Sequence, residues 1–258
     1  MACGISFLSN NLVDSSVFEL TTGTENAQFP LTNLNNESPS YKFRSQENTT
    51  VIRFDLQQTR TIDTIALHGD ANTALGMTAA SVKFSLTTDF SLSAPQNIPL
   101  SAEYIMGYEY VAEVDARYVE LTLTGVGSYV ELSNIFIGQR LNLMQQNIST
   151  NSFAFGYKDN SKTVSNKYGQ RFIDSVNKLK MLSGNIEFCI ASEQDDLDNL
   201  FLRHGTSIPL WVIVDKDGAS LTEAEYKLTM YGYFESMPTW KASGGQTYNT
   251  VIKLGQAG

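Results

Sequence analysis

The run Val51-Ile52-Arg53-Phe54-Asp55-Leu56 places apolar residues mostly at every second position. A strand that buries one face has this period, because successive side chains of a strand point to opposite sides. The same pattern returns in 61–67 and in 81–86. An amphipathic helix would repeat its apolar residues at about every 3.6 positions instead. This stretch of the chain is therefore predicted to be β-structure.

Further strands are predicted at 108–114, 117–123 and 130–137, and turn residues such as Gly69-Asp70 and Gly125-Val126-Gly127 separate the strands. Glycine and aspartate favour turns because they tolerate backbone conformations that other residues avoid. Many short strands with turns between them are typical of a β-sandwich or jelly roll. We expect an all-β-dominated protein whose first domain, residues 1–140, is a jelly-roll β-sandwich.

The second domain, residues 141–258, is predicted to be a smaller antiparallel β domain with one helix. The helix is expected to begin at Ser192, whose side chain can accept free backbone N–H groups, and to stop at Gly205. Its apolar face would be formed by Leu197, Leu200 and Phe201. Strands are expected around it at 186–191, 209–214, 225–235 and 250–254. The polar segment 142–151 is expected to connect the two domains, with a further turn at 216–218.

The charge balance restricts the partners of the chain. Its 258 residues include 18 basic and 27 acidic side chains, for a formal net charge of -9. This charge repels a phosphate backbone, so nucleic-acid binding is not expected. No apolar run is long enough to span a bilayer, so membrane insertion is not expected either. The first residues lack the basic and apolar regions of a secretory signal peptide, which predicts synthesis in the cytoplasm without such a signal.

No catalytic, cofactor-binding or metal-binding residues are predicted. The only histidines, His68 and His204, lie far apart and lack metal-ligand spacing. Cys189 lies within an apolar strand and is expected to be buried. The acidic residues between 193 and 198 lack the spacing of a calcium loop and are expected to stabilise the start of the helix. A hydrolase with a concealed site remains an alternative.

Aromatic and basic side chains in loops are the remaining candidates for binding. Tyr41, Phe43 and Arg44 lie in a turn-rich segment before the first long strand, and Trp240 lies between two predicted strands. Aromatic rings at such positions can stack on a sugar or fill a pocket of a partner protein. These four residues are the predicted ligand or partner contacts.

The first domain resembles the discoidin, or coagulation-factor type C, galactose-binding-like jelly roll. The resemblance lies in the order of Phe29–Leu34, Tyr41–Ser45, Ile62–Asn72 and Ala116–Leu121, and it covers about residues 5 to 140. Phe43 stands where a tryptophan is usual in that family. The basic residues that often line its sugar site are not matched, and we carry over no binding residue.

The segment Glu131–Gly138 at the end of this domain is similar to jelly rolls in tail proteins of tailed bacteriophages. The resemblance implies a non-catalytic structural component of the virion, located in the tail or baseplate and made in the host cytoplasm. Its implied partners are other virion proteins and copies of itself. A carbohydrate-binding adhesin or receptor-binding module that contacts a host-surface glycan is the alternative from another class.

Overall fold

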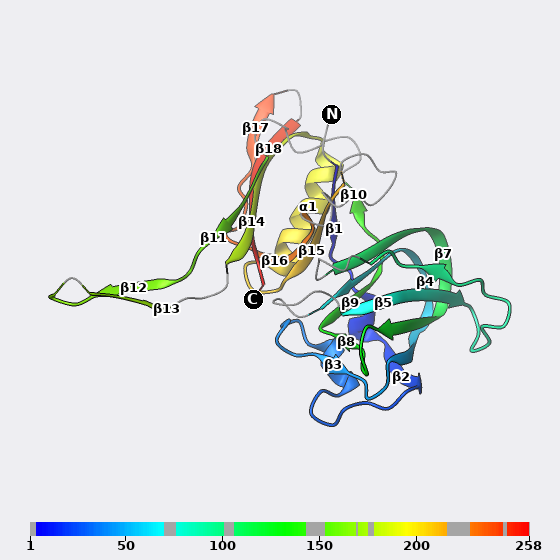
Figure 1. Ribbon diagram of the computed structural model, residues 1–258. Coiled ribbons are helices and arrows are strands. Elements are labelled where there is room, and N and C mark those ends of the chain that lie inside the picture. The colour runs from blue at the N-terminus through cyan, green and yellow to red at the C-terminus, as the bar shows by residue number, and fades with distance from the viewer. Residues whose placement is uncertain are drawn as a thin grey trace.

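The computed structural model describes residues 4–69, 76–100, 106–142, 153–168, 170–174, 178–215, 228–244 and 247–257. Across these ranges the chain consists of antiparallel β-sheets with one α-helix (Figure 1). The predicted fold class, a jelly-roll β-sandwich joined to a smaller β region with one helix, is confirmed. The connection expected at 142–151 and the turn expected at 216–218 fall, except for residue 142, outside the described residues.

The jelly roll is built on a six-stranded sheet in the order β2-β4-β7-β5-β6, with β9 beside β4. Its strands are β2 (Val17–Thr22), β4 (Thr49–His68), β5 (Met77–Ser85), β6 (Gln96–Asn97), β7 (Met106–Gly125) and β9 (Asn134–Gly138). A two-stranded sheet and two short 3-10 helices contribute to the same core: β3 (Phe43–Arg44), β8 (Glu131–Leu132), η1 (Leu12–Ser15) and η2 (Leu31–Asn35).

Two of these strands are longer than the sequence predicts. The segments 51–56 and 61–67 join into the single strand β4, and 108–114 and 117–123 join into β7. The register of β4 against β7 shifts between Asp55 and Arg60. Gln57 has a φ of 65° there, and its N–H donates to the Asp55 carboxylate at 2.7 Å. The polar residues that separate the two predicted strands form a β-bulge, which bends a strand without ending it.

The second sheet has eight strands in the order β10-β1-β15-β16-β18-β14-β11, with β17 paired to β18. They are β1 (Gly4–Leu8), β10 (Leu141–Asn142), β11 (Ala154–Lys158), β14 (Leu179–Cys189), β15 (Leu210–Asp215), β16 (Met230–Phe234), β17 (Lys241–Gly244) and β18 (Thr247–Gln256).

Helix α1 (Ala191–His204) packs on one face of this sheet through the predicted residues Leu197, Leu200 and Phe201. Its start differs slightly from the prediction. Ser192 lies inside the first turn, and the Glu193 carboxylate accepts the backbone N–H of Ile190 at 3.3 Å. The helix stops as predicted at Gly205, where φ is 53° and the N–H donates to the carbonyl of Phe201 at 2.8 Å. Glycine adopts this left-handed φ at little steric cost.

The jelly roll is inserted between two neighbouring strands of the second sheet. Strand β1 pairs with β15 and with β10, the latter through Phe7 opposite Leu141. The chain therefore leaves this sheet after residue 8 and returns to it at residue 141. The predicted boundaries of the first domain, 1–140, are therefore wrong at the start, because residues 4–8 belong to the second sheet. Sequence periodicity identifies a strand but does not reveal a distant partner.

A third apolar cluster, here the central layer, lies between the jelly roll and the second sheet. It comprises Leu8, Ala66, Phe136, Trp211, Ile213, Tyr231 and Ala257. On β15, Trp211 and Ile213 face this layer, whereas Leu210, Val212 and Val214 face helix α1. The alternation follows from the two-residue period of a strand. Both faces of β15 are therefore buried, which explains its continuous apolar run.

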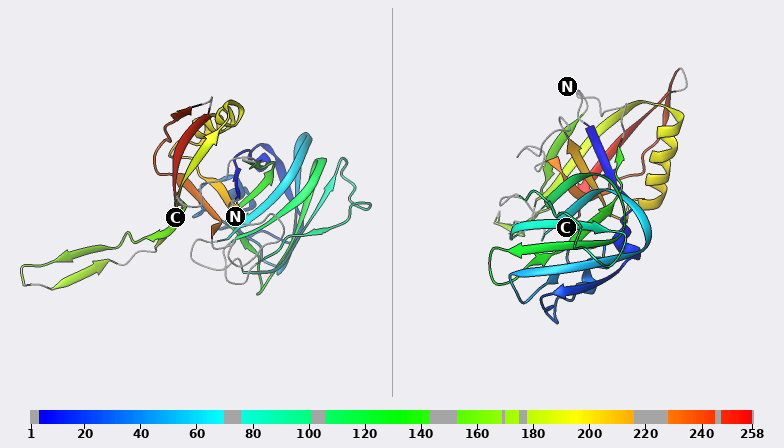
Figure 2. Two further views of the ribbon diagram at one scale, coloured as in Figure 1. Left: turned by 90° about the horizontal axis from the view of Figure 1, so that it is seen from above. Right: turned by 90° about the vertical axis from the view of Figure 1, so that its right-hand side faces the viewer.

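Strands β12 (Lys162–Ser165) and β13 (Arg171–Asp174) form a separate two-stranded sheet between β11 and β14. Figure 1 and the left view of Figure 2 show this hairpin projecting away from both larger sheets. We call residues 158–178 the arm. No strand was predicted in this part of the sequence.

Replacing Trp211 with phenylalanine tests the central layer. The Trp211 indole N–H donates to the side-chain oxygen of buried Asn134 at 3.2 Å. Trp211→Phe removes this donor and should lower the free energy of unfolding by about 1–3 kcal/mol, because a buried polar atom loses its partner. The matched control is Trp240→Phe, since half-buried Trp240 also donates to a side chain and water can replace it. Equal losses in chemical denaturation would contradict this role of Trp211.

Candidate ligand-binding surface

The predicted contact segment enters strand β3 with alternating burial. Lys42 and Arg44 point outward, whereas Phe43 and Ser45 are buried with exposed fractions of 0% and 1%. The two-residue period of a strand requires this division. The segment thus presents its basic side chains to solvent and its large apolar ring to the jelly-roll core.

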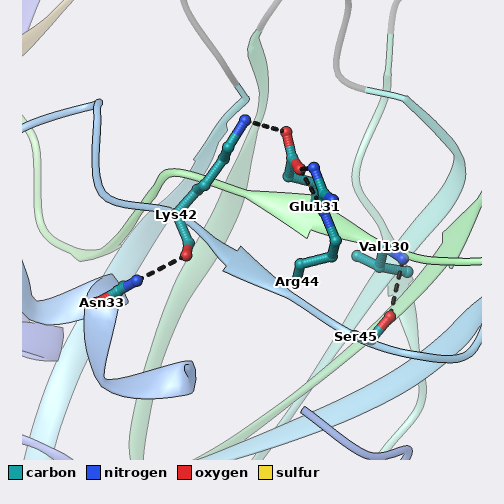
Figure 3. Close-up of polar contacts among 6 residues, drawn as sticks. All are labelled: Asn33, Lys42, Arg44, Ser45, Val130 and Glu131. Carbon is teal, nitrogen blue, oxygen red and sulfur yellow. Dashed lines mark hydrogen bonds and ion pairs between the residues drawn. The ribbon is translucent and has the colours of Figure 1, made fainter. Parts of the chain in front are cut away.

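A carboxylate from a distant strand meets both basic side chains. Glu131 on β8 lies directly opposite Arg44 in the strand register. One oxygen of Glu131 accepts from Lys42 Nζ at 2.9 Å, and the other accepts from Arg44 Nε at 2.7 Å and from Arg44 Nη2 (Figure 3). A guanidinium that donates two N–H groups to one carboxylate has a fixed orientation as well as a favourable charge. The cluster carries one net positive charge.

Two aromatic rings enclose the guanidinium of Arg44. Its central carbon lies 4.6 Å from the ring centroid of Phe29 and 4.6 Å from that of Tyr129. This distance is within the range of a cation–π contact. Because Glu131 occupies only one edge of the guanidinium, the remaining donors of half-buried Arg44 stay available for a ligand.

Hydrogen bonds between side chains and the backbone, and one between backbone groups, hold the two strands that carry this cluster. The Asn33 side chain donates to the Lys42 carbonyl at 2.8 Å. The Val130 N–H donates to the Ser45 hydroxyl oxygen at 2.8 Å (Figure 3). In return, the Ser45 N–H donates to the Val130 carbonyl at 2.9 Å. Ser45 is buried, so these bonds fix the position of β3 against the loop before β8. The charged groups are therefore preorganised.

The four predicted contact residues have different positions. Tyr41 is exposed, at 52%, and Arg44 is half-buried within the charged cluster, so both can reach a ligand. Phe43 is a core residue of the jelly roll, and its prediction as a contact is wrong. The error arises because the segment was treated as a loop, whereas its side chains alternate between buried and outward positions in β3. Phe43 and Arg44 are adjacent in sequence and face opposite sides of the strand.

Trp240 lies apart from these residues, beside helix α1. Its indole N–H donates to the Asp198 carboxylate at 2.5 Å, and its ring centroid lies 6.2 Å from that of Phe201. It also packs against the core between α1 and the second sheet. Trp240 therefore secures the helix, and the structure does not bring it together with Tyr41 and Arg44.

Sequence reasoning missed Phe29, Tyr129 and Glu131 as parts of this surface. Tyr129 is exposed, at 43%, and directly precedes the buried Val130. The alternation of buried Val130, outward Glu131 and buried Leu132 could have marked Glu131 as a surface residue of a strand. Its pairing with Arg44 was not predictable, because 87 residues separate the two in the chain.

A cavity of about 270 Å³ lies between the jelly roll and the second sheet. Burial raises the pKa of Asp14 in its wall, and the negative charge of Glu37 raises it further. Burial also lowers the pKa of His204. The cavity rings, Trp211 and Tyr231, are buried and already donate hydrogen bonds to Asn134 and to the Glu37 carbonyl. They offer no open ring face, so the β3–β8 surface is the better candidate.

Among the described residues, Cys189 and the potential metal ligands do not form a catalytic or metal site. Cys189 is buried as predicted, and burial together with Glu193 raises the pKa of its thiol to about 11. Such a thiol stays protonated and is a poor nucleophile at neutral pH. In the described ranges, no three His, Cys, Asp or Glu side chains are grouped so that they could hold a metal ion. The described part of the chain also has no helix with the length and apolarity needed to cross a membrane.

Comparison with known proteins gives structural likeness alone. No protein-family model matches the chain, and no curated protein matches its sequence. A family 32 carbohydrate-binding module of Clostridium perfringens NanJ, solved with galactose, has 12% identity and a TM-score of 0.40, covering 52% of this chain and 98% of that one. A fucose-binding module of Streptococcus pneumoniae has 10% identity and a TM-score of 0.42, covering 50% and 98%.

The lectin domain of lectinolysin, solved with Lewis B antigen, has 13% identity and a TM-score of 0.43, covering 51% of this chain and 97% of that one. These TM-scores lie below 0.5, so the likeness carries nothing about what this chain binds.

Two substitutions separate core residues from surface residues in the contact segment. Phe43→Ala should lower the free energy of unfolding by about 3–5 kcal/mol, because it leaves a cavity in the core. Tyr41→Ala should change it by less than about 0.5 kcal/mol, because the ring is exposed. Urea denaturation followed by circular dichroism measures both. Comparable destabilisation by the two variants would contradict the opposite orientations of these rings.

Proposed function

We propose that this chain is a non-catalytic glycan-binding protein that uses the surface formed by β3 and β8. The observation that carries the proposal is the Arg44 guanidinium, which contacts the rings of Phe29 and exposed Tyr129 and is fixed by Glu131. Exposed Tyr41 precedes Arg44 by three positions in the chain. A sugar ring has an apolar face that stacks on an aromatic ring, and hydroxyl groups that both donate and accept hydrogen bonds. The surface offers groups for each of these contacts.

The charge of the surface favours a neutral or weakly acidic glycan over a strongly anionic polymer. Lys42 and Arg44 are both engaged by Glu131, so only one net positive charge remains. Arg44 can donate hydrogen bonds to hydroxyl groups, and the Glu131 carboxylate can accept from them. Tyr41 and Tyr129 are exposed, which suits the end or side of a polysaccharide better than a small molecule that must be enclosed.

A glycan array followed by calorimetric titration tests this function. Tyr129→Ala and Tyr41→Ala should each weaken binding by about tenfold, since a stacked ring contributes about 1 kcal/mol or more. Tyr157→Ala is the matched control, because Tyr157 is an exposed tyrosine on β11 of the other sheet. The bound glycan should be recovered uncleaved. Absence of saturable binding, or equal weakening by the control, would overturn the proposal.

A structural role in a virion, as a component of a phage tail or baseplate, is the second candidate. The observation that favours it is the arm, a two-stranded hairpin that no third strand or helix of the described chain covers. An isolated hairpin is at best marginally stable in water, so a projecting one gains stability from a partner. Proteins that assemble into particles need such partner contacts, and a monomeric binding module does not.

Mass spectrometry of purified particles from the producing host tests the structural role. Peptides of the chain should copurify with particles at a ratio fixed by the copy number, and antibodies should label the tail in electron micrographs. Particles that lack the chain at every purification step would refute this role. That outcome would leave the glycan-binding proposal untouched.

A further inference from the structure

The arm has the surface of a docking element. Among its residues whose side chains are described, none is buried. Val164 and Tyr168 are 64% and 77% exposed, although both are apolar enough to gain from burial. The arm also leaves the second sheet at the edge strand β11, whereas the jelly roll is attached at the opposite edge through β1 and β10. It therefore projects away from its own chain (Figure 2).

The charge of the arm is opposite to that of the rest of the molecule. Residues 158–178 contain five basic and two acidic side chains, for a net charge of +3. The remaining 13 basic and 25 acidic side chains give the rest of the chain a net charge of -12. All five basic residues of the arm are exposed: Lys158, Lys162, Lys167, Lys178 and Arg171. Lys158, at the end of β11, already pairs with Glu235 of its own chain at 3.9 Å, which leaves the other four for a partner. Opposite potentials of this kind favour association between copies of the same chain.

Helix α1 carries a surface that is complementary to the arm. Its outer face presents exposed Asp195 and Asp196, followed one and two turns later by Asn199 and Leu202. Leu202 is 79% exposed, whereas the other large apolar side chains of the helix, Leu197, Leu200 and Phe201, are buried in the core. The face thus combines acidic and apolar groups, as the arm combines basic and apolar groups. In the views of Figures 1 and 2 the arm extends away from α1 of its own chain.

We propose that the arm of one copy docks on the outer face of helix α1 of a second copy. Basic residues of the arm pair with Asp195 and Asp196, and Val164 and Tyr168 cover Leu202. Because the two surfaces differ, the contact is head to tail and repeats from copy to copy, giving a ring or a filament. This inference deepens the structural role and rests on it, and it is independent of glycan binding.

Sedimentation velocity at several protein concentrations measures the self-association. At about 0.01 M salt the chain should form oligomers that dissociate at about 1 M salt, because salt screens exposed charges. Lys162→Glu with Lys167→Glu should weaken association by about tenfold or more, since like charges then face each other. The matched control, Arg60→Glu with Lys241→Glu, reverses two exposed charges outside the arm and should have little effect.

A charge exchange distinguishes this contact from any other use of the arm. Asp195→Lys with Asp196→Lys should weaken association by about tenfold or more, as the arm variant does. Mixing the helix variant with the arm variant should restore it, because each then meets an opposite charge on the other. Monomers at every salt and concentration, or no restoration in the mixture, would overturn the proposal. The structural role itself is tested separately, because it would be refuted by the absence of the chain from purified particles.

Discussion

The hydrogen bond from Trp211 to Asn134 lies in the central layer that joins the jelly roll to the second sheet. Trp211 is also in contact with the rings of His68 and Tyr231, at centroid distances of 5.7 and 5.4 Å. Burying an indole requires a partner for its single N–H, because an unpaired buried donor costs about 1–3 kcal/mol. The pairing, together with the apolar contacts of the central layer, favours the observed orientation of the jelly roll on the second sheet. The placement of every exposed surface depends on that orientation.

Strands near the central layer are buried on both faces, because they pack against this layer on one side and against a second core on the other. In β9, Ile135 and Ile137 enter the jelly-roll core, and Phe136 enters the central layer. Strand β15 divides its residues in the same way between the central layer and helix α1. Such strands cannot face water, so binding functions are left to elements farther from the layer. The β3–β8 surface and the arm are two such elements.

The two surfaces differ in chemistry in a way that suits different partners. On the β3–β8 surface, Glu131 compensates one of the two positive charges and the Tyr129 ring is exposed, which suits a hydroxyl-rich ligand. On the arm, the basic side chains are exposed and spread along a hairpin, which suits an acidic protein surface. Attachment at opposite edges of the second sheet keeps the arm clear of the jelly roll. A chain docked through its arm can therefore still present the jelly roll to a ligand.

The sequence by itself determined the local structure of this protein. The two-residue period predicted most strands of the jelly roll, and the helix ending at Gly205 followed from its apolar face and its stop residue. The burial of Cys189 followed from its apolar strand. These features depend on neighbours within a few positions, so their physical causes are visible in a short stretch of residues.

Only the tertiary structure decided which faces are buried and which strands meet. Periodicity shows that Phe43 and Arg44 face opposite sides, but the core decided that Phe43 points inward. The pairing of β1 with β10 and the contact of Arg44 with Glu131 join segments more than 80 residues apart. The stretch that forms the arm was not predicted to contain strands. Pairing between distant strands is decided by how the whole core packs, and no local pattern encodes it.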